Sequence, residues 1–496
     1  METIGRETHP EWPEVVPSAL ATEGLLVAIC AAYVAVWSLA ASSLVRADSW
    51  LTLLAGRDIV AHGLPRHDAL AVMTHGRQWV DEQWLAQLGY YGLAAAGGMK
   101  LAVLATIVLL AASLALAIAF ARRRGASALR IAPFALLPGG FLTSFVRTQV
   151  FSQLLFVGLL ALLASESRRP TRRVYLALPL LALWANLHGA VVVGAALVTL
   201  LGLCELVGRR GAVRALALVA LPWACVLATP YGLSVAGYYR ETLTNPLFRA
   251  ALTEWQPPTL LSPVGLPAFV LAAAVVAALA ARARLLTPFE RGALVLTALG
   301  ALVAVRSIVW LALAALMLLP PVLEDWWPSR NDSARRLNAA LAVAASGLAV
   351  VAFAAAAASS QSHVTRRWPA GAVEAVSRVL RDDPKARVLA SYEYGDWLLY
   401  ASPSVRGRIA FDGRWELLPR KRMQAVLDYL YESGAGWERA GAGYRVLVLN
   451  PVTESRLVRT YESRPATRVL FRSREVVVLD RGRLSLRRRG SRAGTG

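Results

Sequence analysis

Long apolar runs alternate with short polar connections through the first two thirds of the chain. Stretches long enough to cross a bilayer recur between residues 20 and 358, and the first extends from Leu20 to Val45. This alternation predicts about eleven transmembrane helices. Composition agrees, because 56% of the 496 residues are hydrophobic and the mean hydropathy is +0.48. We therefore expect a polytopic α-helical membrane protein.

The segment after the first run, "RADSWLTLLAGRDIVAHGLPRHD" from Arg46, is too polar to cross a bilayer but keeps a helical stripe. The apolar positions of this stripe are Trp50, Leu51, Leu54, Ala55 and Ile59. Their spacing indicates an amphipathic helix that lies along the membrane surface. Residues 46–98 are therefore expected to form an extramembrane loop with surface helices.

The pattern changes near Ser360, where short β-like runs replace the long apolar ones. The runs are "ARVLASYEY", "GRIAFDGRW", "YRVLVLN", "TRVLF" and "EVVVLDR", with helical patterns such as "GAVEAVSRVLRDD" and "KRMQAVLDYLYES" between them. This alternation predicts a small α/β domain over residues 359–484. The basic end of the chain, residues 485–496, is typical of a disordered tail.

Basic residues gather in every second connection of the membrane region, residues 20–358. These connections are "ARRRG", "ESRRPTRR", "VGRRGAVR", "ARARLLTPFER" and "EDWWPSRNDSARR". Because cytoplasmic loops carry an excess of Lys and Arg, these connections and residues 1–19 are expected in the cytoplasm. Residues 46–98, residues 230–262 and the C-terminal domain are then expected on the extracytoplasmic side.

Charge and cysteine content narrow the range of partners. The formal net charge is +21, and about half of the basic residues lie in the C-terminal domain and the basic tail that follows it. This suits either attraction to anionic lipid or glycan or a plain solvated surface. The three cysteines sit in apolar runs and the six histidines lack ligand spacing, so neither a disulfide framework nor a metal site is expected. No P-loop or dinucleotide motif is visible. We expect no nucleic-acid partner and no cofactor, although outer carboxylates could hold a divalent cation.

Polar side chains cluster at the outer ends of the expected helices. They are Asp48, Asp81, Glu82, Arg147, Gln149, Asn186, His188, Tyr231, Glu254 and Arg306. If the helices form a bundle, these ends meet at one membrane face, where a lipid arrives from the side and a polar substrate from outside. Acids beside basic groups suit transfer of a sugar from a lipid phosphate. One carboxylate would deprotonate an acceptor hydroxyl, while Arg and His would offset the charge of the departing phosphate.

Several longer motifs resemble a known family. "DSWLTLLAGRDIVAHGLPRHDALAVMTHGRQWVDEQWLAQLGYY", "VRTQVFSQLLF", "WANLHGA", "TPYG" and "TEWQPP" are similar to bacterial polytopic proteins related to the GT-C glycosyltransferases. "YEYGDWLLY" and "IAFDGRWELLP" resemble the extracytoplasmic domain of the same group. That superfamily includes the protein O-mannosyltransferases and the lipid A aminoarabinose transferases. The resemblance implies a polyprenyl-phosphate sugar donor and a multi-pass location in the bacterial plasma (inner) membrane. It also implies a catalytic acid at the start of the first extracytoplasmic loop, which is the position of Asp48.

Each candidate residue has a proposed role and a structural alternative. The catalytic candidates are Asp48, Asp81 and Glu82, the donor-phosphate candidates are Arg147, His188 and Arg306, and the acceptor or sugar candidates are Gln149, Tyr231, Glu254 and Trp255. Asp48 could instead cap its helix, and the other two acids could favour a helix N-terminus. The arginines could snorkel to lipid headgroups, the histidine could be satisfied by a backbone carbonyl, and the tryptophan could anchor at the interface.

The sequence thus favours an inverting GT-C-like transferase that moves a sugar from a polyprenyl-phosphate donor to an unknown hydroxyl acceptor. Asp412, Arg414 and Glu416 in the C-terminal domain form either a loop salt-bridge set or part of an acceptor groove. Two other functions stay open. A transporter or flippase of a lipid-linked saccharide would carry repeated halves and polar groups near the midplane. A noncatalytic membrane scaffold would tolerate neutral residues in place of the first-loop acids.

Overall fold

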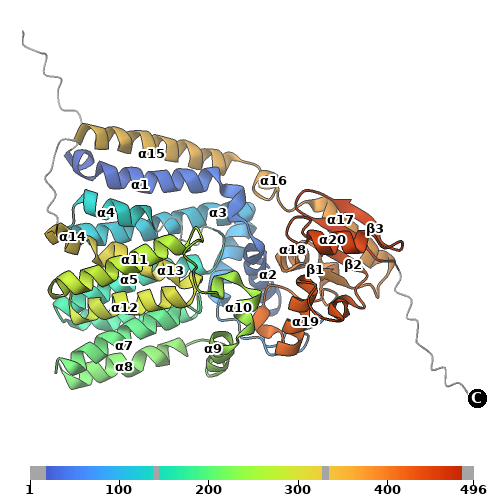
Figure 1. Ribbon diagram of the computed structural model, residues 1–496, viewed down its shortest axis with the longest axis horizontal. Helices are drawn as coiled ribbons and strands as arrows, with labels where there is room; N and C mark the ends of the chain where they lie inside the picture. The colour runs from blue at the N-terminus through green and yellow to red at the C-terminus, as the bar shows by residue number, and fades with distance from the viewer. Residues whose placement is uncertain (1–17, 138–144, 210, 327–334, 483–496) are drawn as a thin grey trace, which may run out of the picture.

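The computed structural model describes residues 18–137, 145–209, 211–326 and 335–482. It consists of a bundle of helices with a C-terminal α/β domain at one end (Figure 1). We call this end of the bundle the near end, and the opposite end, where α14 (Pro320–Trp326) lies, the far end. Residues 1–17 of the predicted N-terminal segment and the predicted disordered tail lie outside the described residues.

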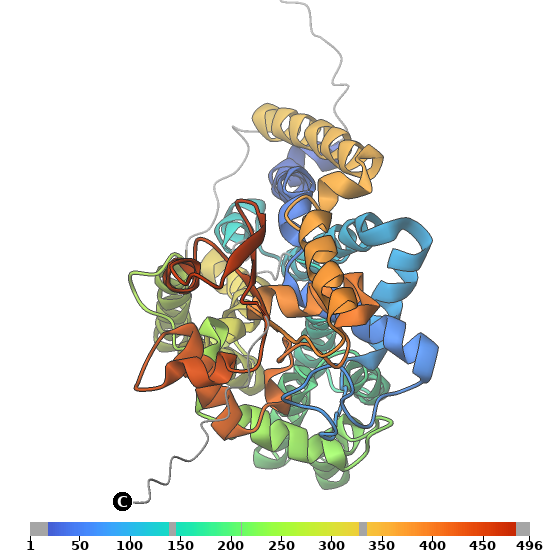
Figure 2. The ribbon, with the colours of Figure 1, turned by 90° about the vertical axis from the view of Figure 1, so that its right-hand side faces the viewer.

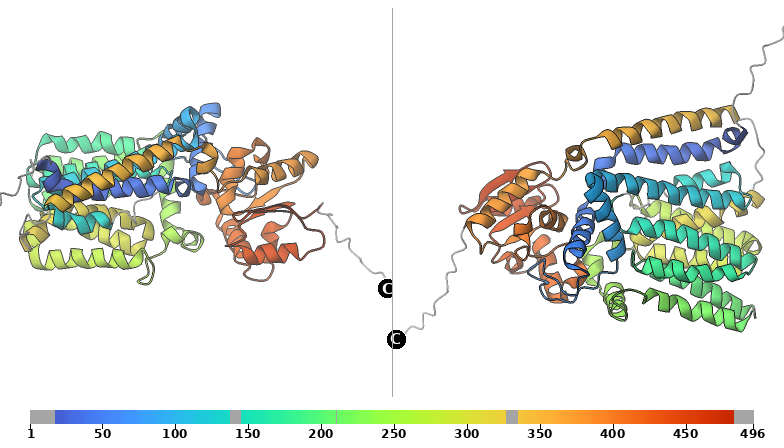
Figure 3. Two further views of the ribbon diagram at one scale, coloured as in Figure 1. Left: turned by 90° about the horizontal axis from the view of Figure 1, so that it is seen from above. Right: turned by 180° about the vertical axis from the view of Figure 1, so that it is seen from behind.

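The helices of the bundle run side by side between its two ends (Figures 1 and 3). They are α1 (Ser18–Leu39), α3 (Trp84–Arg123), α4 (Ala128–Leu136), α5 (Gln149–Arg168), α6 (Ala177–Ala185), α7 (Val191–Val207), α8 (Ala212–Val226), α11 (Gly265–Arg282), α12 (Pro288–Val303), α13 (Ile308–Leu318) and α15 (Arg335–Ala358). In the described part of the chain, four helices are long and apolar enough to cross a membrane, and the bent pair of α13 and α14 could make a fifth. The chain is a multi-pass membrane protein, and the total of about eleven spans stays a prediction.

Helix α3 belongs to both the first loop and the bundle. Its 40 residues are interrupted at Gly97 and Gly98, where the backbone leaves the helical region and Gly98 has a φ of +72°. Residues with a side chain rarely adopt this left-handed conformation, so the break favours glycine. It falls at the end of the predicted loop, residues 46–98, and separates the surface part of α3 from its apolar part.

The centre of the bundle is α13, which is apolar all round. Every residue from Ile308 to Leu318 is buried, as expected of a helix without a polar face. Phe156 of α5 and Trp184 of α6 pack against Trp310, with ring centroids 5.1 and 6.4 Å away. This packing fixes the near ends of three helices from which polar loops emerge.

Helix α2 (Ala47–His62) crosses the near end between the bundle and the C-terminal domain (Figure 3). Its Trp50 packs against Trp368 and Tyr400 of the C-terminal region, with ring centroids 5.6 and 5.3 Å away. Arg57 of the same helix donates to the Tyr400 carbonyl oxygen at 2.8 Å. The surface helix therefore fastens the C-terminal domain to the membrane region.

The C-terminal domain is built on one four-stranded sheet in the order β1-β2-β4-β3. Its strands are β1 (Val388–Ala390), β2 (Val446–Leu449), β3 (Arg468–Arg472) and β4 (Val477–Asp480), and its main helices are α17 (Ala370–Asp382), α18 (Tyr392–Ala401), α19 (Arg420–Leu430) and α20 (Ser455–Glu462). Strands β1 and β2 are parallel, and the other neighbours are antiparallel. Seen from the near end, the domain lies in front of the bundle, while α1 and α15 stay at one edge (Figure 2).

Four of the five predicted β-like runs supply these strands. The remaining run, "GRIAFDGRW", forms only isolated bridges, which join Ile409 to Val388 of β1 and to Ala71 of the first loop. The first loop is therefore attached to the domain by its backbone as well as through α2.

Candidate active site

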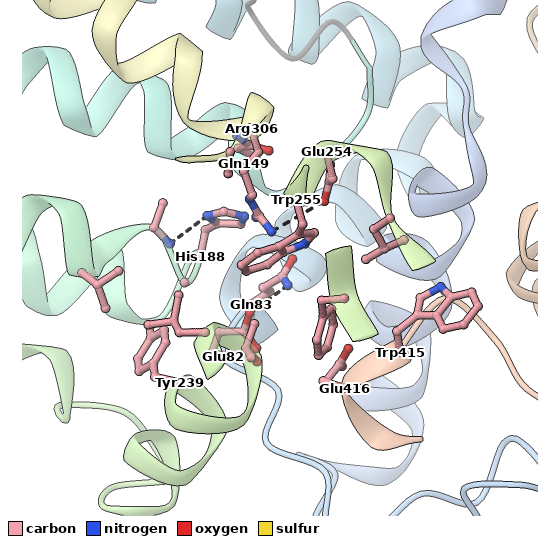
Figure 4. Close-up of a pocket in the computed structure, with 18 of the residues that line it drawn as sticks. Glu82, Gln83, Gln149, His188, Tyr239, Glu254, Trp255, Arg306, Trp415 and Glu416 are labelled. Atoms are coloured by element: carbon pink, nitrogen blue, oxygen red, sulfur yellow. Dashed lines mark hydrogen bonds and ion pairs between the residues drawn. The ribbon is translucent and has the colours of Figure 1, made fainter. Parts of the chain in front are cut away.

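A cavity of about 530 Å³ lies at the near end, between the bundle, α2 and the C-terminal domain. Polar and aromatic residues on its wall include Asp48, Asp81, Glu82, Gln83, Gln87, Arg147, Gln149, His188, Tyr238, Tyr239, Glu254, Trp255, Arg306, Trp415 and Glu416, and Figure 4 shows many of them. Leu296, Leu299 and Val303 of α12 also line the cavity. Because these three side chains are exposed on the bundle, the cavity reaches its apolar flank.

Two backbone hydrogen bonds bring four separate loops together around this cavity. The N–H of Val146 donates to the carbonyl of Leu44 at 2.9 Å, which places the start of α5 beside the start of α2. The N–H of Val305 donates to the carbonyl of Gln256 at 3.0 Å, which joins the loops before α13 and α11. Charged residues far apart in the sequence thereby become neighbours.

Asp48 lies in the first turn of α2 without capping it. The backbone N–H of Arg46, the residue before the helix, donates to the hydroxyl of Ser49 at 3.0 Å. The Asp48 carboxylate instead forms an ion pair with Arg147, with Oδ2 3.1 Å from Nε, and keeps 38% of its side chain exposed. The helix-cap role offered by the sequence therefore does not apply.

Arg147 also pairs with Glu254, which extends the contact into a row of four charges. Its Nη1 and Nη2 donate to the two carboxylate oxygens of Glu254 at 2.9 and 3.2 Å. Nη1 of Arg306 lies 3.6 Å from the same carboxylate, and its guanidinium lies 4.4 Å from the centre of the Trp255 ring. Burial alone would raise the pKa of Glu254, but the two arginines hold it below its ordinary value. The row of Asp48, Arg147, Glu254 and Arg306 is balanced in charge.

His188 lies in the turn between α6 and α7 and is neutral. Its Nδ1 accepts the backbone N–H of Ala190 at 3.1 Å, so the proton of the neutral ring is on Nε2. Burial lowers the pKa of His188 well below its ordinary value, and Arg306 and Arg147 lower it further. The ring can therefore donate one hydrogen bond but does not carry a charge near neutral pH.

Asn186, two residues earlier, holds this turn against the first loop. Its side-chain oxygen accepts from Nε1 of Trp84 at 2.8 Å, and its carbonyl accepts the N–H of Leu85 at 3.1 Å. Its amide donates to the carbonyl of Ala228, after α8, at 2.9 Å. The histidine and the acids before α3 thus share one rigid wall.

Three acids occupy another part of the cavity, and burial raises the pKa of each. The pKa of Asp81 rises to about 7 and that of Glu416 to about 8, and in both cases the nearby Glu82 adds to the effect of burial. The pKa of Glu82 is raised as well. Its Oε1 accepts from the Tyr238 hydroxyl at 2.8 Å, while Oδ1 of Asp81 accepts from Gln87 at 2.9 Å. Within the described ranges, no three His, Cys, Asp or Glu side chains are grouped as metal ligands would be.

Asp412 and Arg414 form a salt bridge, as one of the two sequence interpretations proposed. Arg414 is 3% exposed on its side chain and also donates to Asp68 of the first loop at 2.7 Å. Its guanidinium lies 4.2 Å from the centre of the Trp79 ring. This buried network fixes η8 (Trp415–Leu417), so that Glu416 lines the cavity and does not join the salt bridges.

All the predicted site residues except one line the cavity. The exception is Tyr231, whose ring packs with Val80 and Val235 and whose hydroxyl donates to the Pro65 carbonyl at 3.0 Å. Tyr231 therefore packs against the first loop outside the cavity. Sequence reasoning missed Tyr238 and Tyr239 on α9 (Ser234–Thr244), although an aromatic pair in a polar outer segment is a signal of sugar binding that could have found them.

No known family and no curated protein matches this chain. Among solved structures, it is similar to ArnT from Cupriavidus metallidurans bound to undecaprenyl phosphate, with 16% identity, a TM-score of 0.49 and coverage of 93% of this chain and 99% of that one. It is also similar to the archaeal oligosaccharyltransferase AglB from Archaeoglobus fulgidus in complex with an inhibitory peptide and a dolichol-phosphate. Here the identity is 13%, the TM-score 0.50, and the coverage 86% of this chain and 69% of that one. The likeness to AglB shows that this chain has a GT-C-like fold, as the sequence resemblance predicted.

Proposed function

We propose that this protein is a membrane glycosyltransferase that moves a sugar from a polyprenyl-phosphate donor to an acceptor hydroxyl, with inversion. The observation that carries the proposal is the convergence of Asp48, Arg147, Glu254 and Arg306 on one cavity that also reaches the apolar flank of α12. A donor of this class has a polar sugar and a phosphate, which suit the charged residues of the cavity, and an apolar tail, which suits the flank of α12. The fold agrees with this class of reaction, since AglB, which has a similar fold, was solved in complex with a dolichol-phosphate.

Asp48 is the proposed general base. Its carboxylate pairs with Arg147 and keeps 38% of its side chain exposed, so an acceptor hydroxyl can reach it from the cavity. The carboxylate takes the proton of the acceptor hydroxyl, and the hydroxyl oxygen forms a bond to the anomeric carbon of the sugar. The bond between that carbon and the phosphate oxygen breaks, and the phosphate leaves with the electron pair. Attack from the face opposite the phosphate inverts the anomeric centre.

Arg306 is the proposed main partner of the donor phosphate. Its contact with Glu254 is long, at 3.6 Å, whereas Arg147 is held by Asp48 and by both oxygens of Glu254. The more loosely held guanidinium can turn to a phosphate at the smaller cost. Arg147 then acts mainly as a positioning residue for Asp48, and His188 donates a neutral hydrogen bond through Nε2.

The contacts of the remaining predicted residues indicate different roles for them. Gln149 and Trp255 are proposed to contact the sugar, because both line the cavity near Arg306 (Figure 4). Glu254 serves as the counter-ion that keeps the two arginines in place before the donor binds. Tyr231 takes no part in binding. The near end is proposed to face outside the cell, because the basic connections lie at the far end.

The test is release of polyprenyl phosphate from a panel of polyprenyl-phosphate sugars by purified protein supplied with mixed hydroxyl acceptors. Asp48→Asn should reduce turnover by about 10²–10⁴-fold, which is the typical contribution of a positioned base. Asp58→Asn is the matched control, because Asp58 lies on the same helix but pairs with Arg406 away from the cavity. The control should keep most of the activity. Absence of release from every donor by folded wild-type protein would overturn the proposal and favour the transporter function.

A further inference from the structure

The acids of the cavity are unevenly balanced by cations. Figure 4 shows Arg306 and Glu254 on one side of the cavity and Glu82 and Glu416 on the other. The first side is balanced by ion pairs. On the second side, no Lys, Arg or His of the described ranges lies within ion-pair distance of Asp81, Glu82 or Glu416, although Asp81 and Glu82 are 3% and 4% exposed.

Polar atoms on this acidic side also lack hydrogen-bond partners. Among the described residues that line the cavity, four oxygen atoms are buried without one: Oδ2 of Asp81, Oε1 of Gln87, the Tyr239 hydroxyl and Oγ1 of Thr242. Nη1 of Arg414 is the one nitrogen atom of these residues in the same state. Two of these atoms, on Asp81 and Gln87, can only accept hydrogen bonds when the acid is ionised. Buried polar atoms normally have partners, so this wall is built for a group that brings donors.

The acids come from two distant parts of the chain and are held rigidly. Asp81 and Glu82 precede α3, while Glu416 lies on η8 of the C-terminal domain. Side-chain contacts fix both segments, through the half-buried Asn186 on one side and the buried Arg414 on the other. Uncompensated charge in such a wall destabilises the folded protein unless a ligand of opposite charge binds there.

We infer that the substrate group occupying the acidic side carries a protonated amine, which Asp81, Glu82 and Glu416 bind as an ammonium. This inference deepens the proposed function and rests on it. A phosphate at Arg306 adds negative charge to the cavity, so a cationic group at the opposite wall restores the balance. An ammonium also supplies three hydrogen-bond donors and no acceptor, which matches the unpartnered oxygen atoms.

The state of the acids without a ligand agrees with this assignment. With pKa values of about 7 for Asp81 and about 8 for Glu416, protons neutralise much of the wall when the cavity holds no cation. A bound ammonium would replace those protons. The amine could belong to the transferred sugar or to the acceptor, and the chemistry of the wall is the same for both sources.

The experiment measures binding to the full chain in nanodiscs with two sets of probes. The donor set comprises polyprenyl-phosphate glucose, its 2-amino and 4-amino counterparts, and the two N-acetylated forms, with polyprenyl phosphate alone as the reference. The acceptor set comprises free glucose, glucosamine and N-acetylglucosamine, added to protein already saturated with polyprenyl phosphate. We expect an amino probe in one set to bind about 10–100-fold more tightly than its hydroxyl and N-acetyl counterparts, as a charged hydrogen bond provides. The set that shows the preference identifies the source of the amine.

Two variants keep the test informative if one of them fails to fold. Glu82→Gln and Glu416→Gln should each reduce the amine preference at least several-fold while leaving the affinity for polyprenyl phosphate unchanged. Glu241→Gln is the control, because Glu241 lies on α9 in an exposed pair with Arg420, and it should keep the preference. An unchanged preference in both cavity variants would overturn the inference.

The outcomes also separate this inference from the proposed function. Binding of polyprenyl phosphate without any amine preference in either set overturns the inference and leaves the transferase proposal standing. Failure to bind polyprenyl phosphate at all contradicts the transferase proposal itself, and the inference falls with it.

Discussion

The two ends of the bundle differ in whether their acidic side chains have ion-pair partners. At the far end, Glu290 is fully buried and pairs with Arg124 at 2.9 Å and Arg168 at 2.7 Å. Arg214 likewise pairs with Glu205 at 3.0 Å and Glu166 at 3.3 Å. These contacts join α5, α7, α8 and α12 to one another or to the loop after α3. The acids of the far end thus have the partners that a structural role requires.

At the near end, only part of the acidic charge is matched. Asp48 pairs with Arg147, and Glu254 pairs with both Arg147 and Arg306. Asp81, Glu82 and Glu416 have neutral hydrogen-bond partners or none in the described ranges. An unpaired buried carboxylate destabilises the fold, so its presence is better explained by a ligand than by packing. The absence of an ion pair, rather than burial, therefore distinguishes the acids proposed to bind an ammonium from the structural acids of the far end.

The largest expected effect concerns stability at the far end. Glu290→Ala leaves two arginines without their shared carboxylate, and breaking a buried pair costs about 3–5 kcal/mol. The matched control is Glu241→Ala, which breaks an exposed ion pair worth at most about 1 kcal/mol. Thermal unfolding in detergent should show a large decrease in the unfolding temperature of Glu290→Ala and a small decrease in that of Glu241→Ala. Equal decreases would show that the ion pairs of Glu290 do not stabilise the far end more than an exposed pair does.

A second prediction concerns donor affinity at the near end. Arg306→Ala should weaken binding of polyprenyl phosphate by about 10–100-fold, because a charged hydrogen bond to the phosphate is lost. Arg282→Ala, which breaks an ion pair with Asp325 at the far end, should leave the affinity unchanged. Titration of both variants in nanodiscs checks this. Similar losses in the two variants would place the phosphate elsewhere or make the effect unspecific.

The smallest expected effect is a pH dependence of stability. The raised pKa of Asp81, about 7, means that the folded protein binds a proton that the unfolded chain has already released above pH 4. Stability should therefore fall as the pH rises from about 4 to 7. Asp81→Asn removes this titration and should reduce the decrease of the unfolding temperature over that range by about 2–4 °C. An identical pH profile for the variant would show that Asp81 is not a raised-pKa acid.

Much of the fold could be predicted because it follows from local patterns. Apolar runs located the bundle helices, the stripe through Trp50 located α2, and alternating runs located four strands of the C-terminal sheet. The run around Ile409 has the same local pattern but makes only isolated bridges, since its partners are one strand and a distant loop. Local periodicity does not contain such long-range pairing.

The part of the site that could be predicted consists of residues identified by their position along the chain. Asp48, Arg147, Glu254 and Arg306 all stand at the outer ends of apolar runs, and the structure brings them together. Glu416 was grouped with Asp412 and Arg414 as either a salt-bridge set or part of an acceptor groove, because nothing local shows that Arg414 pairs with Asp412 and the distant Asp68 and leaves Glu416 out. Tyr231 illustrates the reverse: it lies in an outer segment, as predicted, but packs against the first loop and does not line the cavity.

The most direct test of the account is a structure of the protein in nanodiscs saturated with polyprenyl phosphate. We expect the phosphate at the near end, within hydrogen-bonding distance of the Arg306 guanidinium, with the lipid chain along Leu299 and Val303 of α12. A second cavity, of about 410 Å³, lies at the far end and is lined by Arg124 and Arg168. Phosphate bound there, with the near end unoccupied, would contradict the account.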